Sequence, residues 1–309
     1  MMIMDKNICY IRAKLKKDYS FDGIKRAGYK IIIPYKDYNL FMRVMREAWF
    51  RLKLPGRHLW YNPEVKKLKE SILILEDPLI TMDFLQYLRK RYPEARIIFK
   101  YDNRVSAALS PDLIRPIVSE LWSYDPDDCK NYGLRFTGNS YYEFYRIKQD
   151  PVTQYDVLYV GRDKGRLEKL LETEANLKAQ GLTTNFYICA DRSFLTWRKK
   201  IYKPVLPYED YLELMKKSKA ILNIAPEGQR SITLRELEAA FDSIKCITNN
   251  KGILDFPLYD PSRYYLLDNN YDGIKEFLSV PFVPVPEETL KEYEFGKMIN
   301  RLVYAEDAE

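Results

Sequence analysis

Short apolar runs alternate with amphipathic stretches along most of the chain. In the first half the apolar runs predict strands near residues 28–33, 71–76, 96–101 and 118–123, and the stretches between them predict helices at 37–52, 63–69 and 82–92. In the second half the pattern predicts strands at 156–160, 184–190, 219–224, 244–248 and 263–267, helices at 164–179, 208–218, 231–242 and 272–279, and a last amphipathic stretch at 287–302. Because strands and helices alternate, we expect parallel sheets covered by helices on both faces.

The pattern restarts near residue 150, which indicates a domain boundary. The sequence Asp150–Gln154 separates the two halves, and a length of 309 residues suits two domains of ordinary size. We therefore expect an α/β fold with two doubly wound, Rossmann-like domains, at residues 1–150 and 151–309, that face each other across a cleft. Ligands of such sheets bind beyond the carboxyl ends of the strands, so the polar residues after each strand are the first candidates for a site.

Composition argues against several classes of protein. With 46% hydrophobic and 30% charged residues the chain is globular, and its apolar runs fall far short of the roughly 20 residues that a membrane-spanning helix needs. The first residues lack the apolar region and cleavage site of a signal peptide, so we expect a cytoplasmic protein. The four cysteines are scattered singly and His58 is the only histidine, which disfavours a zinc site or a disulfide framework.

Basic residues are concentrated in the first half of the chain. Residues 1–150 hold 28 Lys and Arg against 19 Asp and Glu, a net charge of +9, whereas the remainder has a net charge of −3. An anionic partner is therefore expected to meet the first half.

The region 36–69 mixes cations with aromatic residues. The cations include Arg43, Arg46, Arg51, Lys53, Arg57, Lys66, Lys67 and Lys69, and the aromatic residues are Phe41, Trp49, Phe50, Trp60 and Tyr61. This mixture is typical of a segment that rests on anionic lipid, so it predicts peripheral contact with the inner face of the cell membrane. The alternative is a solvated helix whose aromatic residues belong to the core. Nucleic acid is not expected, because the pI near 8.8 is modest and no recognition motif accompanies it.

A strand, a break and a helix follow one another between residues 220 and 241. Ala220–Ile224 is apolar, Pro226 and Gly228 interrupt the chain, and Ser231 or Thr233 can cap the helix that follows. At about 100° per residue this helix has an apolar stripe and a polar stripe, the latter formed by Ser231, Arg235, Glu238 and Asp242.

This polar stripe predicts a nucleotide site. An arginine near free N–H groups suits a phosphate, and a carboxylate suits the paired hydroxyls of a ribose. The alternative is a plain amphipathic helix in which Arg235 and Glu238 form an exposed ion pair.

The loop Val160–Arg166 follows the first strand of the second half and leads into a helix. It places Arg162, Lys164 and Arg166 beside two glycines, a combination that suits a diphosphate. The sequence matches neither common glycine-rich nucleotide motif, so a solvated turn remains the alternative.

These segments together resemble the nucleotide-binding half of GT-B glycosyltransferases. The resemblance rests on the strand followed by Gly161-Arg162 and Lys164-Gly165, on Glu238-Ala239, and on the strand Lys245–Thr248. A bacterial group associated with capsule or lipopolysaccharide synthesis is more specifically similar, at Gln229, Thr233–Arg235, Glu238-Ala239, Ile247–Asn249, Ser123–Asp128 and Tyr132–Leu134. The resemblance covers most of the chain. It implies the GT-B fold, with a nucleotide-diphosphate sugar as co-substrate and no other cofactor.

The resemblance also implies a division of labour between the two domains. The first would receive the acceptor and the second would hold the donor, through Gly161, Arg162, Lys164, Arg166, Glu227, Gln229, Ser231, Thr233, Arg235 and Glu238. Glu238 would hold the ribose, while the hydroxyls and the guanidinium near the helix N-terminus would stabilise charge on the leaving nucleotide. We therefore expect a glycosyltransferase that moves a sugar to a hydroxyl of a bacterial surface glycan, either free or lipid-linked.

One departure from the family pattern concerns position 230. Retaining GT-B enzymes often have two glutamates eight positions apart, but Arg230 stands eight positions before Glu238, and Glu227 lies three further upstream. Retention or inversion of the sugar's configuration is therefore left open. A catalytically inactive nucleotide-sugar or glycan-binding subunit is the main alternative, and an epimerase or phosphorylase is a third.

A general base would come from the first domain. Asp77 and Asp102 follow predicted strands, and the imidazole of His58 suits proton transfer near neutral pH, although a single histidine is often structural.

The run Asp125–Asp128 invites comparison with a metal-binding Asp-x-Asp motif. Asp127 or Asp128 more simply caps a helix that begins near Cys129, so no metal site is expected.

Overall fold

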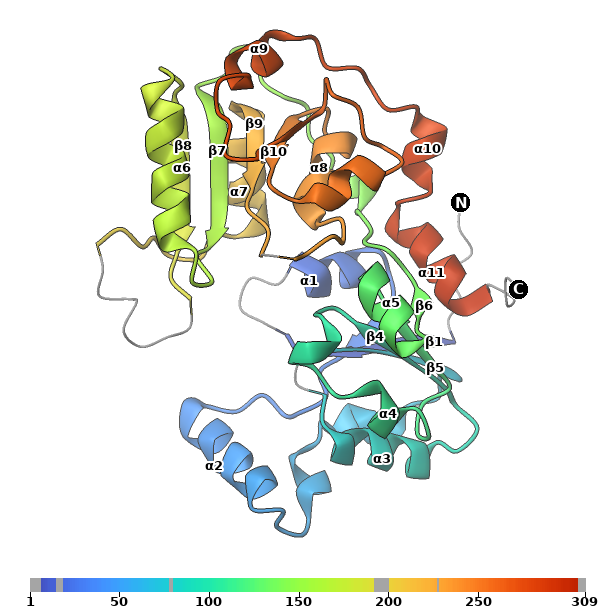
Figure 1. The fold of residues 1–309 in the computed structure, drawn as a ribbon. Coiled ribbons are helices and arrows are strands. Elements are labelled where there is room, and N and C mark those ends of the chain that lie inside the picture. Colours follow the sequence, from blue (N-terminus) through green and yellow to red (C-terminus); the bar gives the residue numbers. More distant parts are fainter. Residues whose placement is uncertain (1–6, 15–18, 78–79, 192–199, 227, 305–309) are drawn as a thin grey trace. The chain divides into compact units, whose positions relative to one another are not determined.

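The computed structural model describes residues 7–14, 19–77, 80–191, 200–226 and 228–304 (Figure 1). The chain divides into two compact units, Met1–Thr137 with Asn300–Glu309 and Gly138–Ile299. Residue 150, where the sequence indicates a boundary, falls inside the second unit. Each unit is built on one parallel sheet, of six strands in the first and five in the second, which confirms the predicted fold class.

The first unit contains a sheet in the order β2-β1-β3-β4-β5-β6. Its strands are β1 (Ile8–Arg12), β2 (Lys30–Ile32), β3 (Ile72–Glu76), β4 (Arg96–Tyr101), β5 (Glu120–Ser123) and β6 (Arg135–Phe136). Its helices are α1 (Tyr19–Arg26), α2 (Leu40–Arg51), α3 (Met82–Arg91), α4 (Pro111–Ile114) and α5 (Pro126–Tyr132), with the 3-10 helices η1 (Arg57–Trp60), η2 (Pro63–Lys67) and η3 (Val105–Ala107).

The sequence pattern did not predict strand β1, which lies between β2 and β3 inside this sheet. All five of its residues are buried. The apolar run is short because the last of them, Arg12, is charged. The helix predicted at 63–69 is a 3-10 helix, in which the side chain of Asn62 accepts from the N–H of Glu64 and Pro63 occupies the first turn.

The second unit contains a sheet in the order β11-β10-β9-β7-β8. Its strands are β7 (Tyr155–Arg162), β8 (Thr184–Cys189), β9 (Ser218–Asn223), β10 (Lys245–Thr248) and β11 (Tyr264–Leu266). Its helices are η4 (Glu143–Tyr145), α6 (Leu167–Ala179), α7 (Tyr208–Lys216), α8 (Leu234–Phe241), η5 (Lys251–Asp255), α9 (Ile274–Ser279) and α10 (Glu287–Lys291). The stretch predicted at 287–302 forms two helices, α10 and α11 (Phe295–Tyr304), and α11 crosses the division between the units.

Each sheet packs its strands against helices through aliphatic and aromatic side chains. In the first unit Leu73, Ile97 and Phe99 are fully buried. In the second unit Val157, Ala220 and Ile247 are fully buried on the corresponding strands. Among the described helices none is both long enough and apolar enough to cross a membrane.

The order of strands reverses once in each sheet. The reversal lies between β1 and β3 in the first unit and between β7 and β9 in the second. In open parallel sheets a crevice forms beyond the carboxyl ends of the two strands at this point, and ligands bind there. The loops after β1 and β3, and after β7 and β9, are therefore the places to look for a site.

Candidate functional site

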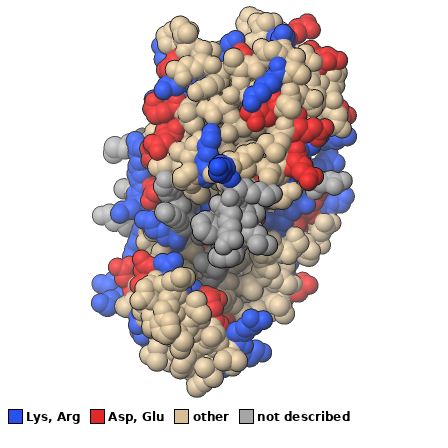
Figure 2. Space-filling view, turned by 90° about the vertical axis from the view of Figure 1, so that its left-hand side faces the viewer, with Lys and Arg blue, Asp and Glu red and all other residues tan. Residues whose placement is uncertain are grey.

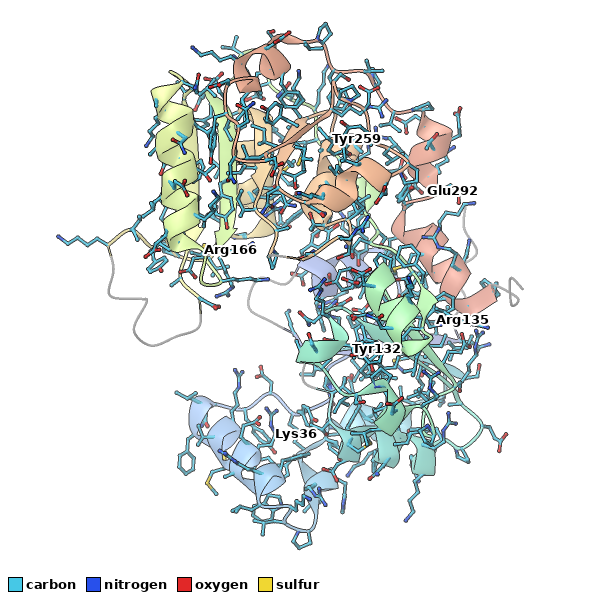
Figure 3. All side chains as sticks on the ribbon, in the orientation of Figure 1. Lys36, Tyr132, Arg135, Arg166, Tyr259 and Glu292 are labelled. Atoms are coloured by element: carbon cyan, nitrogen blue, oxygen red, sulfur yellow. The ribbon has the colours of Figure 1, made fainter. Side chains whose placement is uncertain are left out.

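The loop after β7 is tied to the ends of both neighbouring strands. Arg162 donates to the carbonyl oxygen of Ala190 after β8 at 3.1 Å, and Arg166 donates to the carbonyl oxygen of Ile224 after β9 (Figure 3). Lys164 and Gly165 both have left-handed backbones, with φ of 44° and 79°, and a glycine adopts this conformation without steric cost. The loop therefore reverses tightly into α6 while its cations stay beside the switch point of the sheet.

The loop after β9 is held by residues that follow β10. The Asn249 side chain accepts from the N–H of Ala225 at 2.7 Å and donates to its carbonyl oxygen at 3.2 Å. A Cβ atom at Gly252 would lie 1.9 Å from the Arg230 carbonyl oxygen, so only glycine fits this approach. Within the loop, the Gln229 N–H donates to the Pro226 carbonyl oxygen at 3.2 Å. Glu227 lies outside the described residues.

The N-terminus of α8 is anchored by a buried carboxylate. Thr233 is the N-cap, as one of the two predicted alternatives, and Glu236 accepts from its N–H at 2.6 Å. Glu236 is fully buried and also accepts from the side chains of Asn223, Thr248 and Asn250. Burial raises the pKa of Glu236, and these hydrogen bonds act in the opposite direction. The carboxylate thus joins α8 to the ends of β9 and β10.

One hydroxyl at this helix end has no hydrogen-bond partner among the described residues. It is Ser231 Oγ, on a residue that is 2% exposed, whereas the Thr233 side chain accepts from the N–H of Glu236 in a capping box. Because buried polar atoms are nearly always hydrogen-bonded, Ser231 Oγ is the unusual atom at the start of α8.

Arg235 and Glu238 form an ion pair, but this pair is buried rather than exposed. The Arg235 guanidinium lies 2.7 Å from a Glu238 oxygen, and the Glu238 side chain has no exposed surface. Glu238 also accepts from the hydroxyls of Tyr208 and Tyr211, at 2.8 and 2.7 Å. The polar stripe expected to face a ligand is therefore covered by α7 at Glu238, because both oxygens of this carboxylate are engaged there.

Arg235 itself stays at the edge of the site. It lies over the Tyr211 ring at 4.0 Å and donates to the Val160 carbonyl oxygen of β7 at 3.1 Å, and its side chain is 24% exposed. Burial lowers the pKa of Arg235, but Glu238 and Tyr211 raise it by more, so the guanidinium carries its charge at every accessible pH. A fixed cation therefore links α8 to the end of β7.

The remaining loop cations are less constrained. Lys164 is exposed, and desolvation together with Arg166 lowers its pKa. Arg230, at a position where retaining GT-B enzymes often have a glutamate, is exposed and pairs with Asp255 at 2.6 Å. At Gly161 there is little room for a side chain, since an added Cβ would lie 3.0 Å from the hydroxyl of Tyr159 on the same strand.

A row of buried charges crosses three strands of the first unit. Arg12, Glu76 and Lys100 are register partners on β1, β3 and β4, so they lie side by side at the carboxyl edge of the sheet. Arg12 lies 2.6 Å from Glu76, and Lys100 lies 3.0 Å from the other Glu76 oxygen. Asp102, just after β4, forms an ion pair with Lys100 and lies 3.4 Å from Arg12. We call these four residues the charge row.

Within the charge row, the pKa values of Glu76 and Asp102 shift in opposite directions. Burial and Asp102 raise the pKa of Glu76. Burial also raises the pKa of Asp102, but Lys100 and Arg12 lower it by more, so the net shift is downward. Arg12 and Lys100 were not among the candidate site residues, because β1 was not predicted and a lysine within an apolar run gave no signal of its own.

Asp77, a candidate base, is engaged within the first unit. It accepts from the N–H groups of Asp102 and Asn103, and from the Asn103 side chain at 2.7 Å. Burial, reinforced by Asp102, raises the pKa of Asp77 to about 6. The carboxylate therefore has the basicity of a general base, but its hydrogen bonds go to the loop after β4.

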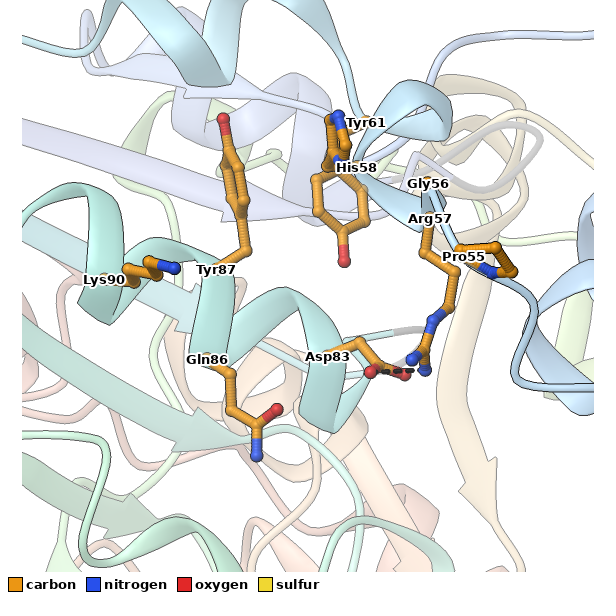
Figure 4. Close-up of a pocket in the computed structure, with 9 residues that line it drawn as sticks. All are labelled: Pro55, Gly56, Arg57, His58, Tyr61, Asp83, Gln86, Tyr87 and Lys90. Atoms are coloured by element: carbon orange, nitrogen blue, oxygen red, sulfur yellow. Dashed lines mark ion pairs between the residues drawn. The ribbon is translucent and has the colours of Figure 1, made fainter.

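His58, the third candidate, lies on η1 rather than at a strand end. It lines an open cavity of about 280 Å³ with residues of the preceding loop and of α3, among them Asp83, Gln86 and Tyr87 (Figure 4). An ion pair between Arg57 and Asp83 crosses this cavity. The structure thus places His58 on a different part of the first unit from the charge row.

Asp125 and Asp128 accept from backbone N–H groups at the starts of two helices. Asp125 is the N-cap of α5 and accepts from the N–H groups of Asp127 and Asp128, so the capping residue lies earlier than predicted. Asp128 accepts from the N–H of Val105, at the start of η3. In the described parts of the chain no group of three or more metal-ligating side chains occurs.

Comparisons with known proteins identify the fold. The chain matches lipopolysaccharide outer core galactosyltransferase WaaB in its apo form with a TM-score of 0.51 and 14% identity, over 96% of this chain and 99% of that one. Two further structures match with lower scores. One, assigned as a UDP-N-acetylglucosamine 2-epimerase from Listeria monocytogenes, has a TM-score of 0.47 and 8% identity over 96% of this chain and 95% of that one. The other, Acinetobacter baumannii MurG, has a TM-score of 0.43 and 11% identity over 88% of each chain.

The protein has the GT-B glycosyltransferase fold. This confirms the fold that the sequence resemblance implied. No protein-family model matches the chain, and no curated protein matches it in sequence.

Proposed function

We propose that this protein is a glycosyltransferase that moves a sugar from a nucleotide-diphosphate donor to a hydroxyl of a bacterial surface glycan. The observation that carries the proposal is the switch point of the second sheet, where Arg166 of the β7 loop reaches the end of β9 and Arg235 of α8 reaches the end of β7. The GT-B fold supports the same conclusion. We assign donor binding to the second unit and acceptor binding to the first, with capsule or lipopolysaccharide as the acceptor class.

The proposed chemistry is stabilisation of the leaving nucleotide. As the bond between sugar and diphosphate breaks, negative charge grows on the diphosphate oxygens. Arg166 and Arg235 would face this charge with fixed guanidinium groups, and the hydroxyls of Ser231 and Thr233 would donate to it. Donors that are already positioned stabilise the transition state without the cost of reorganising water.

Glu238 has a more specific assignment in this proposal. Both of its oxygens are hydrogen-bonded, so a ribose hydroxyl would have to displace Tyr208 or Tyr211. We assign Glu238 primarily to the positioning of Arg235, and its contact with ribose stays a prediction. Gln229, Gly161, Arg162 and Lys164 complete the proposed donor site, together with Glu227.

The general base is proposed among Asp77, Asp102 and His58. Of the two aspartates, Asp77 has the higher pKa. Asp102 is the more exposed, with 24% of its side chain accessible to solvent. Asp77→Asn, Asp102→Asn and His58→Gln separate the three candidates. The base is the residue whose replacement removes transfer to the acceptor while binding of the donor is kept.

A nucleotide-sugar or glycan-binding subunit without catalysis is the second candidate function. Arg230 favours it, because the position that often carries a catalytic glutamate in retaining enzymes is an exposed arginine paired with Asp255. Such a subunit would use the same site to assist another transferase.

A screen of nucleotide sugars separates the two functions. Thermal stabilisation by one nucleotide sugar, with slow release of its nucleotide in the absence of acceptor, supports the transferase. Stabilisation without any release, with or without lipid-linked acceptors, favours the binding subunit. Arg235→Ala should abolish the stabilisation in both cases. If no nucleotide sugar or nucleoside diphosphate stabilises the parent protein, the proposed site is wrong.

A further inference from the structure

Helix α2 turns an apolar face to the solvent. None of its 12 residues is buried, and Leu40, Phe41 and Val44 are 78%, 69% and 60% exposed. Leu52, directly after the helix, and Leu59 in η1 are also exposed. Single exposed apolar side chains are ordinary, but a set of them on one face marks a surface that binds a partner.

The packed side of α2 is the opposite one. Phe50 packs edge-on against Tyr35 in the core, the Arg46 guanidinium lies over the same ring at 4.5 Å, and Trp49 packs on Trp60. At about 100° per residue the exposed residues Leu40, Phe41, Val44, Met45 and Ala48 fall within one arc of about 140°. We call these five residues the α2 face.

This arrangement changes which residues could meet a membrane. Of the five aromatic residues that the sequence singled out, Tyr61 is buried and Phe50 packs against the core. Trp49 and Trp60 are partly buried against each other, which leaves Phe41. The solvent-facing surface is therefore mostly aliphatic.

Cations are concentrated in the segment that carries the α2 face. Residues 36–69 contain nine Lys and Arg against three Asp and Glu, a net charge of +6 that equals the net charge of the whole chain. Arg43, Arg51 and Lys53 are exposed near the helix. Figure 2, which looks onto this side of the protein, shows a largely uncharged surface at the level of α2, with Lys and Arg and some Asp and Glu at its margins.

A second copy of the chain would fit this surface poorly. A symmetric dimer through α2 would bring the same basic margin against itself, and like charges repel across an interface. An anionic bilayer instead attracts the cations and accepts the aliphatic side chains. A helix of 12 residues is about 18 Å long, which suits a helix that lies in the plane of the headgroups.

We propose that α2 docks the protein on an anionic membrane, with the α2 face inserted at the boundary between headgroups and acyl chains. The cations of residues 36–69 face the lipid phosphates. This inference does not rest on the transferase activity, because it concerns only the surface of α2.

Vesicle flotation with the full chain tests the proposal. The probes are vesicles of phosphatidylcholine alone and of phosphatidylcholine with phosphatidylglycerol. We expect the parent to bind only the anionic vesicles, and Phe41→Asp with Val44→Asp to weaken partitioning by at least about 100-fold. Leu113→Asp is the matched control, since Leu113 is a 61% exposed leucine on α4 of the same unit.

Charge and insertion are tested separately. Arg51→Gln with Lys53→Asn should weaken binding by about fivefold for each cation removed, and asparagine tolerates the left-handed backbone of Lys53, whose φ is 52°. Phe41→Trp places a fluorophore on the α2 face, and its emission should shift to the blue with anionic vesicles.

Three outcomes would overturn the proposal. They are no binding of the parent to anionic vesicles, an equal loss in the Leu113→Asp control, and an unchanged emission of Phe41→Trp. Sedimentation that reveals a dimer broken by Phe41→Asp with Val44→Asp, without vesicle binding, would assign the α2 face to a second copy instead.

Discussion

The hydroxyl of Tyr141 lies 2.9 Å from Asp242 Oδ2 and 3.1 Å from the carbonyl oxygen of Tyr145. One hydroxyl proton cannot serve both acceptors. A protonated Asp242 resolves the conflict, because it donates to Tyr141 while Tyr141 donates to Tyr145. Burial raises the pKa of Asp242 to about 7, in agreement with this geometry, while the N–H of Ile147 donates to its other oxygen and lowers the pKa.

We expect Asp242→Asn to stabilise the protein above neutral pH. The pKa of Asp242 is higher in the folded state than in the unfolded state, so ionisation costs stability as pH rises from the unfolded value toward and above about 7. The asparagine amide can donate to Tyr141 at every pH. The gain should reach about 4 kcal/mol above pH 8 and vanish near pH 4, as the free energy of unfolding from urea titrations would show. Parallel pH curves for parent and variant would contradict the assignment.

Ser231→Ala should weaken nucleotide binding without lowering stability, because the Ser231 hydroxyl has no partner among the described residues and its loss removes no internal hydrogen bond. Thr233→Val should weaken binding and also cost about 0.5 to 2 kcal/mol in stability, because the Thr233 side chain caps α8. A bond to a charged diphosphate contributes about 1.5 to 3 kcal/mol, so each variant should bind a nucleoside diphosphate about 10- to 100-fold more weakly by calorimetry.

Ser262→Ala is the matched control for Ser231→Ala. Ser262 is also buried, but its hydroxyl donates to Asp260 and accepts from the N–H of Val283. The control should lose stability and keep its affinity. The opposite pattern would remove the Ser231 hydroxyl from the proposed site.

Glu76→Ala should destabilise the first unit strongly. Glu76 contacts both Arg12 and Lys100, and its removal leaves two buried cations without this counter-charge. Such a loss costs about 3 to 5 kcal/mol in the free energy of unfolding. Asp22→Ala, which removes an exposed pair with Lys14 at 3.9 Å, should have little effect. Similar unfolding midpoints for the two variants would show that the charge row contributes no more than a surface pair.

Gly252→Ala should displace the loop after β9. Its new methyl group would meet the Arg230 carbonyl oxygen at 1.9 Å, and a backbone atom cannot rotate away. We expect a loss of more than about 2 kcal/mol in stability together with weaker nucleotide binding. At Gly273 an added Cβ would meet only the Tyr265 side chain, at 3.1 Å, so Gly273→Ala should be tolerated. Equal melting temperatures for Gly252→Ala and the parent would refute the close approach.

The sequence pattern predicted most of the sheet strands because parallel strands buried on both faces are uniformly apolar. It failed at β6, which has only two residues, and at β1, where the apolar run ends after four residues at Arg12, a residue type normally found outside. The register that pairs Arg12 with Glu76 depends on which strands become neighbours, and a pattern along one strand contains no such information.

The local structure around the candidate donor residues was predicted more fully in the loops than in the helix. Arg166 and Thr233 were named from strand and cap signals that act locally. The burial of Glu238 could not be predicted, because Tyr208 and Tyr211 reach it from α7, a helix far away in the sequence. A helical wheel shows which residues share a face, but not what covers that face.

The charge row has a consequence for how the first sheet assembles. The sequences Ile-Cys-Tyr-Ile of β1 and Ile-Leu-Ile-Leu of β3 could slide past each other with little change in the apolar contacts they make. A slip of β1 by one residue would place Arg12 opposite Leu75 or Asp77, and would turn the side chains of β1 to the other face of the sheet. Only the observed register brings Arg12 and Lys100 together on the two oxygens of Glu76, so the charges favour one alignment of strands whose apolar residues alone would allow several.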